Sequence, residues 1–564
     1  MVIRLSPFAG MLPRVSTKLL PQDKAQTARN AKLISGELRP FLDASVVQAL
    51  NASTRVVFPD VPGATRTWVQ FDSDADIVNS PIKTATGFQL FCFTTGGKIL
   101  NSGSWSSTIT RPMHGYVVSG DPNYVASFYY LGVPKPTTPI AFNADTGTLS
   151  PDPPDPAQTE TRYYVYTFVT AWGEEGPPSD PSPAREWNPG AVINLKSMDT
   201  SPGANYNTGS GTKRIYRTNT GYAGTEYQLV AEIPMATTTY ADSIADDQLG
   251  EVLPSSDWVA PPTDMVGITA MANGILAGFY GREIYFCEPY QPHAWPIAYR
   301  LIVEDVIVAL GAYETNLVIV TEGQTWIASG VDSAAMALTK IPIDQSCTNK
   351  RGMANCGSHG VVYPSPDGLI AIGNKGIRNV TEQIMSRREW QDLGPENIIG
   401  FGHDEKYFGF YSSGDGFVID LNAPDYVELH LLAPVTGGYS DLYEDALYLI
   451  WNGNLTKWEG DTDPLDFSWR SKVFELPYPV NFGCAQVYYE AGDGTELYLS
   501  VYADGVLKHR QCIASATPSN NPVGTAPFRL PSGFMSRQWD FLLEGDVNVQ
   551  SASIAEVMSE IGRT

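Results

Sequence analysis

The chain has 564 residues, more than one hydrophobic core organises, so about two to four domains are expected. Its 42 prolines, 51 glycines and 29 tyrosines favour many short strands joined by tight turns. The formal net charge of -24 argues against a protein that grips nucleic acid, because such proteins normally carry a basic patch. It does not argue against a surface that DNA slides past without being held.

Residues 1–45 are predicted to be an N-terminal arm. Residues 1–40 carry seven basic and two acidic groups, whereas the remaining chain is acidic. Such an arm can bind nucleic acid or an acidic neighbouring subunit, and we favour the neighbour because an arm without its own core usually needs a partner to order it. Deleting residues 1–40 is then expected to leave the rest of the chain folded and to weaken assembly. The residues expected in this inter-subunit contact are Arg14, Lys18, Arg29, Asn30 and Arg39.

Residues 46–149 are predicted to form the first part of a β-propeller, with strand-like runs beginning at Arg66, Phe88 and Tyr124. A Pro- and Asp-rich linker at 150–160 then interrupts the propeller. Residues 150–260 are predicted to form an inserted β-sandwich, whose first strand and turn resemble a fibronectin type III module. Residues 145–260 carry 16 acidic and 6 basic groups, so this insert is an acidic lobe.

Residues 261–465 are predicted to form the second part of the propeller. Pairs of strand-like runs separated by turn residues recur at intervals of 42 to 45 residues, beginning at Gly274, Asn316, His359, Asp404 and Ala446. A strand repeat of this length is typical of propeller blades, and a series of ordinary β-sandwiches explains the even spacing less well. The spacing leaves the blade number open between about five and eight.

Two further segments complete the expected fold, which is all-β throughout. The stretch YFCEPYQPHAWP (285–296) cannot continue a regular strand beyond Glu288, so we expect a rigid loop between blades with Trp295 buried. Residues 466–564 are predicted to be a C-terminal β-domain, either a sandwich or the completion of a final blade.

The sequence offers no enzyme motif, and no catalytic, cofactor-binding or metal-binding residue is predicted. DSDAD places carboxylates at alternate positions but lacks the glycine and distal glutamate of an EF-hand, so we interpret it as a solvated acidic turn, with an ion site as the alternative. The six histidines lie far apart, with no carboxylate at a telling spacing, and His293 has no evident catalytic partner. The cysteines are expected to be buried free thiols. The residues concerned are Asp72, Asp74 and Asp76, and Cys92, Cys287, Cys347, Cys356, Cys484 and Cys512.

The chain's start lacks a secretory signal, and no apolar run approaches the length of a membrane span, so no membrane insertion is expected.

Several stretches together resemble the tail nozzle proteins of short-tailed bacteriophages, also called tail tubular protein B or tail hub. They include the leader, YTFVTAWGEEGPPSDPS, NGILAGFYGREIYFCEPYQPHAWP and the tail from FRLPSGFMSRQWDF onward. The leader matches the family's AxNxxLxxGxLRP cadence at Ala28, Asn30, Leu33, Gly36, Leu38, Arg39 and Pro40.

The resemblance implies a structural virion protein without enzymatic activity. Such proteins form a homohexameric ring below the portal and adaptor, with a channel that conducts genomic DNA during ejection. The implied partners are the tail adaptor (head-to-tail connector) protein and tail fibres or spikes, with DNA passing without specific binding. The implied location is the virion tail, after assembly in the bacterial cytoplasm. The arm would pack across its own subunit or onto a neighbour. The alternative is a tail-associated carbohydrate-binding protein or depolymerase that acts on host surface glycans.

Overall fold

The protein is described by a computed structural model that is nearly all-β. The residues it describes are 1–59, 67–82, 90–101, 103–117, 126–147, 155–221, 224–423, 425–490, 495–514 and 523–561. Two compact units emerge: unit 1 holds residues 1–57, 320–325 and 342–564, and unit 2 holds residues 58–319 and 326–341. The predominance of strands confirms the prediction of an all-β fold.

Unit 1 contains three consecutive four-stranded antiparallel meanders, the form of a propeller blade. The first consists of β31 (Ala354–Asn355), β32 (Val361–Ser365), β33 (Gly368–Gly373) and β34 (Gly376–Asn379). The second consists of β35 (Ile399–His403), β36 (Lys406–Phe410), β37 (Asp415–Asp420) and β38 (Asp425–His430). The third consists of β39 (Val435–Asp441), β40 (Ala446–Trp451), β41 (Asn454–Lys457) and, from far upstream, β5 (Ser45–Ala49).

Unit 2 contains sheets of the same form. One consists of β8 (Ile77–Asn79), β9 (Leu90–Phe93), β12 (Met113–Val117) and β13 (Ala126–Tyr130). The next consists of β23 (Val266–Ala270), β24 (Leu276–Tyr280), β25 (Glu283–Phe286) and β26 (Leu301–Ile302). The third consists of β27 (Ile307–Tyr313), β28 (Asn316–Thr321), β29 (Trp326–Ser329) and β30 (Ala337–Lys340). The end of β28 and the turn after it, residues 320–325, are assigned to unit 1. Shorter pairs are β6 (Val56–Pro59) with β7 (Trp68–Phe71), and β10 (Leu100–Asn101) with β11 (Ser104–Trp105).

The repeat read from the sequence corresponds to one hairpin in each meander. Each of the five predicted units forms the two central strands of a four-stranded meander, from β24–β25 to β40–β41. Local turn chemistry explains why this could be foreseen. Asn452 and Gly453 form the two-residue loop between β40 and β41 with φ of 50° and 74°, the left-handed conformation that an Asn-Gly hairpin turn requires.

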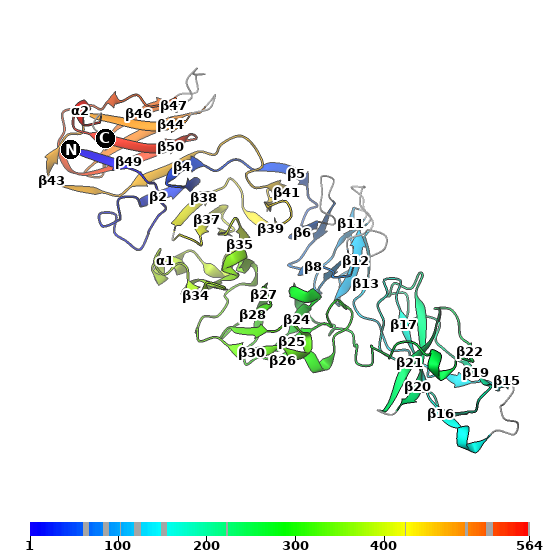
Figure 1. Ribbon diagram of the computed structural model, residues 1–564. Helices are drawn as coiled ribbons and strands as arrows, with labels where there is room; N and C mark the ends of the chain where they lie inside the picture. The colour runs from blue at the N-terminus through cyan, green and yellow to red at the C-terminus, as the bar shows by residue number, and fades with distance from the viewer. Residues whose placement is uncertain are drawn as a thin grey trace. The chain divides into compact units, whose positions relative to one another are not determined.

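The N-terminal residues of unit 1 contribute strands to three sheets and do not form a separate arm. β2 (Ala25–Arg29) lies between β38, to which it is parallel, and antiparallel β42 (Phe467–Ser471). Figure 1 places β1 (Val2–Leu5) and β4 (Glu37–Pro40) beside the C-terminal strand β50 (Asn548–Ala555), with which both pair. The side chains of Leu5, Ala28 and Leu38 are at most 1% exposed. The segment is therefore part of the core of unit 1 and does not form a separate arm.

The C-terminal strands of unit 1 belong to two large sheets with one shared core. The ten-stranded sheet runs β35-β36-β37-β38-β2-β42-β49-β45-β46, with β43 beside β49; its further members are β43 (Phe474–Val480), β45 (Leu497–Ala503), β46 (Val506–Ala514) and β49 (Ser536–Gly545). The seven-stranded sheet holds β1, β4 and β50 together with β3 (Ala31–Ile34), β44 (Cys484–Glu490), β47 (Val523–Gly524) and β48 (Phe528–Arg529).

A group of strands in unit 2 has its own apolar core, built around side chains such as Tyr166, Phe168 and Leu195. These strands, seen together in Figure 1, are β14 (Ala141–Phe142), β15 (Thr146–Gly147), β16 (Glu160–Arg162), β17 (Tyr164–Val169), β18 (Arg185–Trp187), β19 (Ala191–Lys196), β20 (Thr212–Gly221), β21 (Gly224–Pro234) and β22 (Tyr240–Asp242). Because β14 and β15 pair with β19, the insert begins before the expected boundary at 150. Residues 150–154 of the linker that was expected to open it lie outside the described residues.

The loop at 285–296 differs from its prediction in one respect. The regular strand ends at Phe286, and Trp295 is 1% exposed with its indole N–H donating to the Pro292 carbonyl (2.8 Å), as expected. However, the loop joins β25 to β26 within one sheet, so it does not connect two blades. The hairpin rhythm could not reveal this, because β26 has only two residues.

Helices are short. They are α1 (Arg387–Asp392), which begins with a Ser386–Glu389 capping box, and α2 (Met558–Ile561). None of the helices in the described ranges has the length and apolarity to span a bilayer.

Candidate functional site

Two adjoining hollows in unit 1 share Arg29 and His430, and together they are called the Arg29 groove. The first has a volume of about 500 Å³ and is lined by residues of β37, β38, α1 and the loop after it. The second has a volume of about 660 Å³ and is lined by residues of β42, β45, β46 and β49. Strand β2 therefore lies between the two hollows, and the parallel placement of this strand creates the groove.

The groove is floored by a row of side chains that crosses the ten-stranded sheet. Arg29 lies opposite Glu428 on one side and Ser468 on the other, and Ser468 lies opposite Glu544. Glu544 in turn lies opposite Tyr498. Residues opposite one another in a sheet project from the same face, so strands far apart in the sequence present one continuous polar surface.

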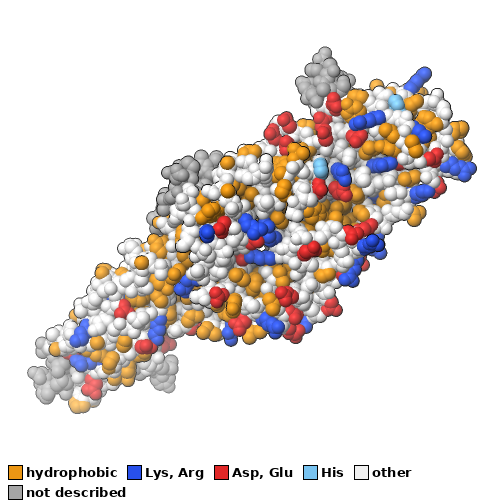
Figure 2. Space-filling model, turned by 180° about the vertical axis from the view of Figure 1, so that it is seen from behind, with side chains coloured by type: hydrophobic (Ala, Val, Ile, Leu, Met, Phe, Trp, Pro, Cys, Tyr) orange, Lys and Arg blue, Asp and Glu red, His pale blue; other side chains and the backbone are white. Residues whose placement is uncertain are grey.

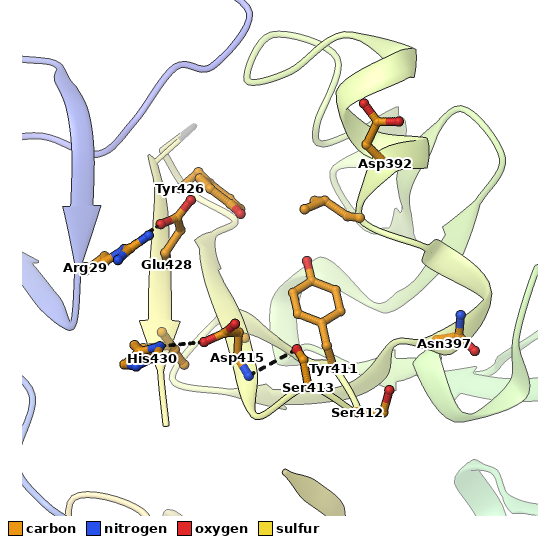
Figure 3. A pocket seen from close by; sticks show the side chains of 13 residues that line it. Arg29, Asp392, Asn397, Tyr411, Ser412, Ser413, Asp415, Tyr426, Glu428 and His430 are labelled. Atoms are coloured by element: carbon orange, nitrogen blue, oxygen red, sulfur yellow. Dashed lines mark hydrogen bonds and ion pairs between the residues drawn. The ribbon is translucent and has the colours of Figure 1, made fainter. Parts of the chain in front are cut away.

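Ion pairs tie this surface together (Figure 3). Arg29 Nε lies 3.0 Å from Glu428 Oε2, and His430 Nδ1 lies 2.6 Å from Asp415 Oδ1. In the second hollow, Arg510 lies 3.4 Å from Glu544 and its guanidinium stacks 4.4 Å from the centroid of the Tyr498 ring. These exposed pairs contribute little stability individually, but they fix the orientation of the side chains that a ligand would meet.

Carboxylates outnumber guanidinium groups in the groove. The guanidinium groups are those of Arg29 and Arg510, and the carboxylates are those of Asp392, Asp415, Glu428, Asp466, Glu496 and Glu544. The excess negative charge has a local effect: burial first, and then the nearby charges of Asp466 and Glu496, raise the pKa of Asp546. The groove is therefore suited to a cationic group and unsuited to nucleic acid.

The molecular face in Figure 2 agrees with this reading of charge. Lys and Arg side chains on that face lie among Asp and Glu side chains instead of gathering in one patch. Such a face lacks the extended basic footprint with which proteins hold nucleic acid.

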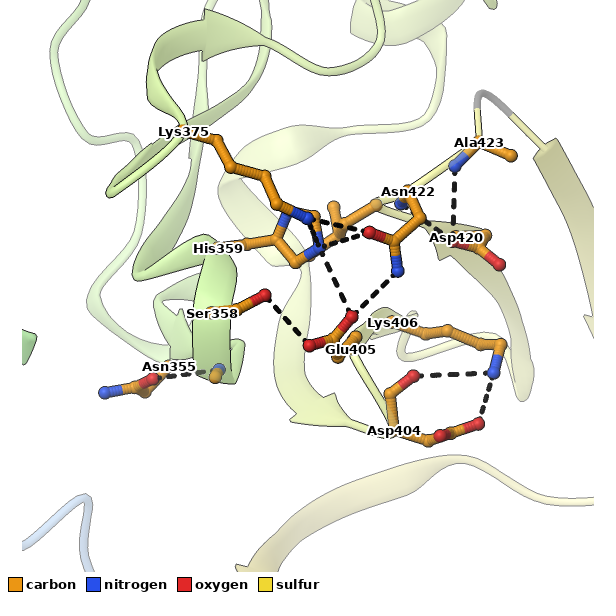
Figure 4. Close-up of polar contacts among 12 residues, drawn as sticks. Asn355, Ser358, His359, Lys375, Asp404, Glu405, Lys406, Asp420, Asn422 and Ala423 are labelled. Atoms are coloured by element: carbon orange, nitrogen blue, oxygen red, sulfur yellow. Dashed lines mark hydrogen bonds and ion pairs between the residues drawn. The ribbon is translucent and has the colours of Figure 1, made fainter.

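A second polar cluster surrounds His359 in unit 1 (Figure 4). Arg378 Nη2 lies 2.6 Å from His359 Nδ1, and the Nε2 atom lies 3.2 Å from Asn422 Oδ1. Because a guanidinium can only donate, Nδ1 must accept, and Nε2 therefore carries the proton and donates to Asn422. Burial, and then the charges of Lys375 and Arg378, lower the pKa of His359. The neutral imidazole thus joins the meander of β31–β34 to the meander of β35–β38.

A third cluster, in unit 2, has the geometry of a nucleophilic triad. His114 Nδ1 lies 2.7 Å from Glu174 Oε1, and His114 Nε2 lies 3.0 Å from Ser80 Oγ. Burial raises the pKa of Glu174, but the charge and hydrogen bond of His114 outweigh it and hold this pKa below its ordinary value. Serine, imidazole and carboxylate in this order are the parts of acyl-transfer catalysis.

Access excludes that chemistry in this conformation. Ser80, His114 and Glu174 are 7%, 0% and 2% exposed, and Trp172 covers the imidazole with its ring centroid 4.6 Å away. Among the described residues, the serine hydroxyl is therefore buried and does not open onto a substrate pocket. The cluster instead fastens the turn after β17 to the sheet of β8 and β12.

The five predicted arm residues separate into two groups. Arg29 pairs with Glu428, Arg39 with Glu37 (3.0 Å), and the Asn30 side chain accepts the His430 N–H (2.9 Å) and donates to the Asp466 carbonyl (3.3 Å). Arg14 donates to the Glu382 carbonyl. Lys18 is exposed, and its ammonium forms no ion pair within the part of the chain that the structure describes.

The acidic turn is more structured than expected. Asp72 accepts the Lys98 N–H at 2.7 Å and Asp76 accepts the Gly267 N–H at 2.8 Å, so these carboxylates cap backbone groups and the turn is only partly solvated. Across the described ranges, no group of three potential metal-ligating side chains comes together.

The cysteine prediction holds except at one position. Five thiols are buried, and burial raises the pKa of Cys287 to about 12. Cys512, in contrast, is exposed and lines the Arg29 groove, which corrects the expectation that all six would be buried. Alternation along β46 was the only signal in the sequence that could have placed it outside.

Comparison with known proteins gives no family. No family model matches the chain, and no curated protein matches it.

Solved structures give only loose likenesses. Sqt1 of Saccharomyces cerevisiae aligns with a TM-score of 0.30 at 8% identity, over 74% of this chain and 98% of its own. BBS1N, solved in complex with ARL6DN, aligns with a TM-score of 0.26 at 13% identity, over 45% and 88%. The WD40 repeats of RRP9 align with a TM-score of 0.24 at 9% identity, over 54% and 92%. Values of this size carry no argument about function, and the blade-like sheets are established by their own strand pairing.

Proposed function

We propose that the chain is a structural virion protein, the subunit of a homohexameric tail nozzle in a short-tailed bacteriophage. In this role it forms the DNA conduit below the portal and adaptor, meets the adaptor and the tail fibres or spikes, and performs no catalysis. DNA passes through the lumen without specific binding. The proposal rests on the sequence resemblance of the leader, and the position of those leader residues is the observation that carries it.

Four of the seven leader residues that bear the resemblance have a clear structural role. Ala28 and Leu38 are 0% exposed in the core of unit 1. Asn30 adopts a left-handed conformation with φ of 47°, and its amide connects the ends of two strands. Gly36 has φ of 83°, and a Cβ there would lie 2.5 Å from Pro7 Cβ. A motif whose residues serve packing and turns is what a structural subunit requires.

The finer architecture follows from the same proposal. The four-stranded meanders are β-propeller blades. The strands from β14 to β22 form an inserted fibronectin type III-like sandwich, and the strands after Asp466 form a C-terminal β-domain that the leader completes. Copies of this subunit associate around an axis by head-to-tail contacts that close by rotation.

The net charge of -24 suits passage of DNA. An acidic wall repels phosphates, so a genome under ejection moves past without being retained. Subunit contacts, and not affinity for DNA, would then hold the lumen at its width.

The purified chain, alone and with the adaptor, tests this function by native mass spectrometry and by electron microscopy of the particles. Sixfold rings with an axial bore are expected. The alternative is tested by incubating the same sample with host surface polysaccharide and measuring the polymer's size. A trimer or monomer that shortens the polysaccharide would overturn the nozzle and establish a depolymerase.

A further inference from the structure

One exposed turn of unit 1 carries a positive charge that is complementary to the excess negative charge of the Arg29 groove. It comprises residues 15–20 and is called the Lys18 turn. Leu19 is 77% exposed, and the adjoining Lys18 ammonium forms no ion pair within the described ranges. Two other exposed cations are engaged, in contrast: Arg387 pairs with Asp367 at 2.9 Å, and Arg14 donates to the Glu382 carbonyl.

Backbone hydrogen bonds and one buried side chain hold the Lys18 turn in place. The Val473 N–H donates to the Thr17 carbonyl at 3.0 Å, and the Leu19 N–H donates to the Ser16 carbonyl at 2.8 Å. Leu20, the next residue, is 2% exposed and anchors the turn in the core. Lys18 and Leu19 are thus presented to solvent by a fixed backbone, so little conformational entropy would be lost on docking.

The groove offers complementary chemistry. Asp466 and Glu496 line its second hollow, and among the described residues neither carboxylate forms an ion pair with a lysine or arginine. Tyr498 and the exposed Cys512 line the same hollow and provide a less polar surface beside the carboxylates. A lysine followed by a leucine matches this pattern of charge and apolar area.

We propose that the Lys18 turn of one copy docks into the Arg29 groove of a second copy. The donor and acceptor surfaces are different, so the contact is heterologous and propagates from copy to copy until rotation closes it. This inference rests on the proposed ring. It assigns the ring contact to Lys18, Leu19 and the second hollow, whose lining includes Arg29 and Asn30. It leaves Arg39 as a residue of the subunit's own fold.

Cys512 supplies a direct test, because the other five thiols are buried. In Leu19→Cys, mild oxidation removes two electrons and two protons from the facing thiols of two copies and leaves a disulfide. A ladder of covalent oligomers on non-reducing gels is expected, with the introduced thiol joined to Cys512 of another chain in peptide mass spectrometry. The double variant Leu19→Cys/Cys512→Ser should give no ladder. Leu442→Cys, at a position that is 93% exposed and outside the groove, is the matched control and should give none either.

A charge swap gives a second readout that needs no oxidation. Lys18→Glu should weaken self-association by about tenfold at low salt, and high salt should reduce the difference because exposed charges are screened. Adding Glu496→Lys should restore most of the association.

The outcomes separate this inference from the proposed function. The Leu19→Cys variant could form rings of unchanged mass without a disulfide between the introduced thiol and Cys512 of another chain. That result would overturn the docking contact alone. A disulfide between that thiol and Cys512 found only within single chains would do the same. Absence of any ring, with and without the adaptor, together with absence of the cross-link would overturn both.

Discussion

The N-terminal segment of unit 1 and the insert of unit 2 are organised in opposite ways. Residues 1–49 provide strands to three different sheets, and apart from the β3–β4 hairpin their partners lie about 400 residues or more away in the sequence. The strands from β14 to β22 pair only among themselves and surround one core. The comparison teaches that strand-rich composition alone does not decide whether a segment is a module. What decides it is whether the segment's hydrogen-bonding edges are satisfied within the segment.

The largest expected effect comes from deleting residues 1–44. The deletion takes β2 out of the middle of the ten-stranded sheet, leaves β38 and β42 without their shared partner, and removes core side chains such as Leu5 and Leu38. The loss should exceed the roughly 5–15 kcal/mol that stabilises a domain, so unit 1 should fail to fold. Solubility, near-UV circular dichroism and hydrogen exchange would measure this. A soluble truncated chain with full protection in unit 1 would show that the leader is an appendage after all.

The insert provides the counterpart. Residues 133–255 expressed alone should fold, because their core and strand pairing are complete within the fragment. A cooperative thermal transition is expected. A fragment that melts without cooperativity would remove the contrast between the two regions.

A smaller effect is expected from Arg217→Met in the insert. Arg217 and Asp242 form an ion pair at 2.6 Å, and both side chains are 0% exposed. Removing the arginine leaves a buried carboxylate with the Tyr164 hydroxyl and one backbone N–H, and should lower the free energy of unfolding of the insert by about 3–5 kcal/mol. Urea unfolding of residues 133–255 measures it. Lys135→Met, which removes the exposed pair with Asp180, is the control and should cost about 0–1 kcal/mol. Equal losses in the two variants would contradict the importance of burial.

The smallest effect concerns pH at the place where the insert meets its blade. Burial, assisted by His114 and opposed by Glu174, lowers the pKa of His293 to about 4. Between pH 6.5 and 4, the His293 imidazole is therefore protonated in the unfolded chain but neutral in the folded chain. Unit 2 loses stability as pH falls through this range. The slope from this group is at most about 1.4 kcal/mol per pH unit.

Urea unfolding of the full chain at pH 7 and pH 5, followed by hydrogen exchange in unit 2, would measure this slope. His293→Gln should flatten it, and His430→Gln, at an exposed site in unit 1, should not. Stability that rises on acidification would sink the assignment to His293.

The sequence revealed local structure well. The five repeated hairpins could be predicted because their strands adjoin in the sequence and their turns contain residues such as Asn452 and Gly453, which tolerate a left-handed backbone. The buried Trp295 and the end of β25 could be predicted for the same reason, since prolines act on their immediate neighbours.

Long-range pairing could not be read in this way. Nothing local in Ala25–Arg29 indicates that it lies between β38 and β42, and the polar residues of this segment suggested an arm although Ala25 and Ala28 are buried. The candidate groove was missed for the same reason, since its floor is assembled from five strands that are separated in sequence. His114 and Glu174 are likewise brought together only by the attachment of the insert.

The placement of β2 also has a consequence for synthesis in the cell. Its antiparallel partner β42 ends at Ser471, some 440 residues after β2 leaves the ribosome. At roughly 5–20 residues per second, β2 waits on the order of 20 to 90 seconds before that partner exists. Throughout that time a nascent chain displays an unpaired strand edge and unsheltered apolar side chains. Translation speed and chaperone supply, more than thermodynamic stability, should therefore set the yield of native protein.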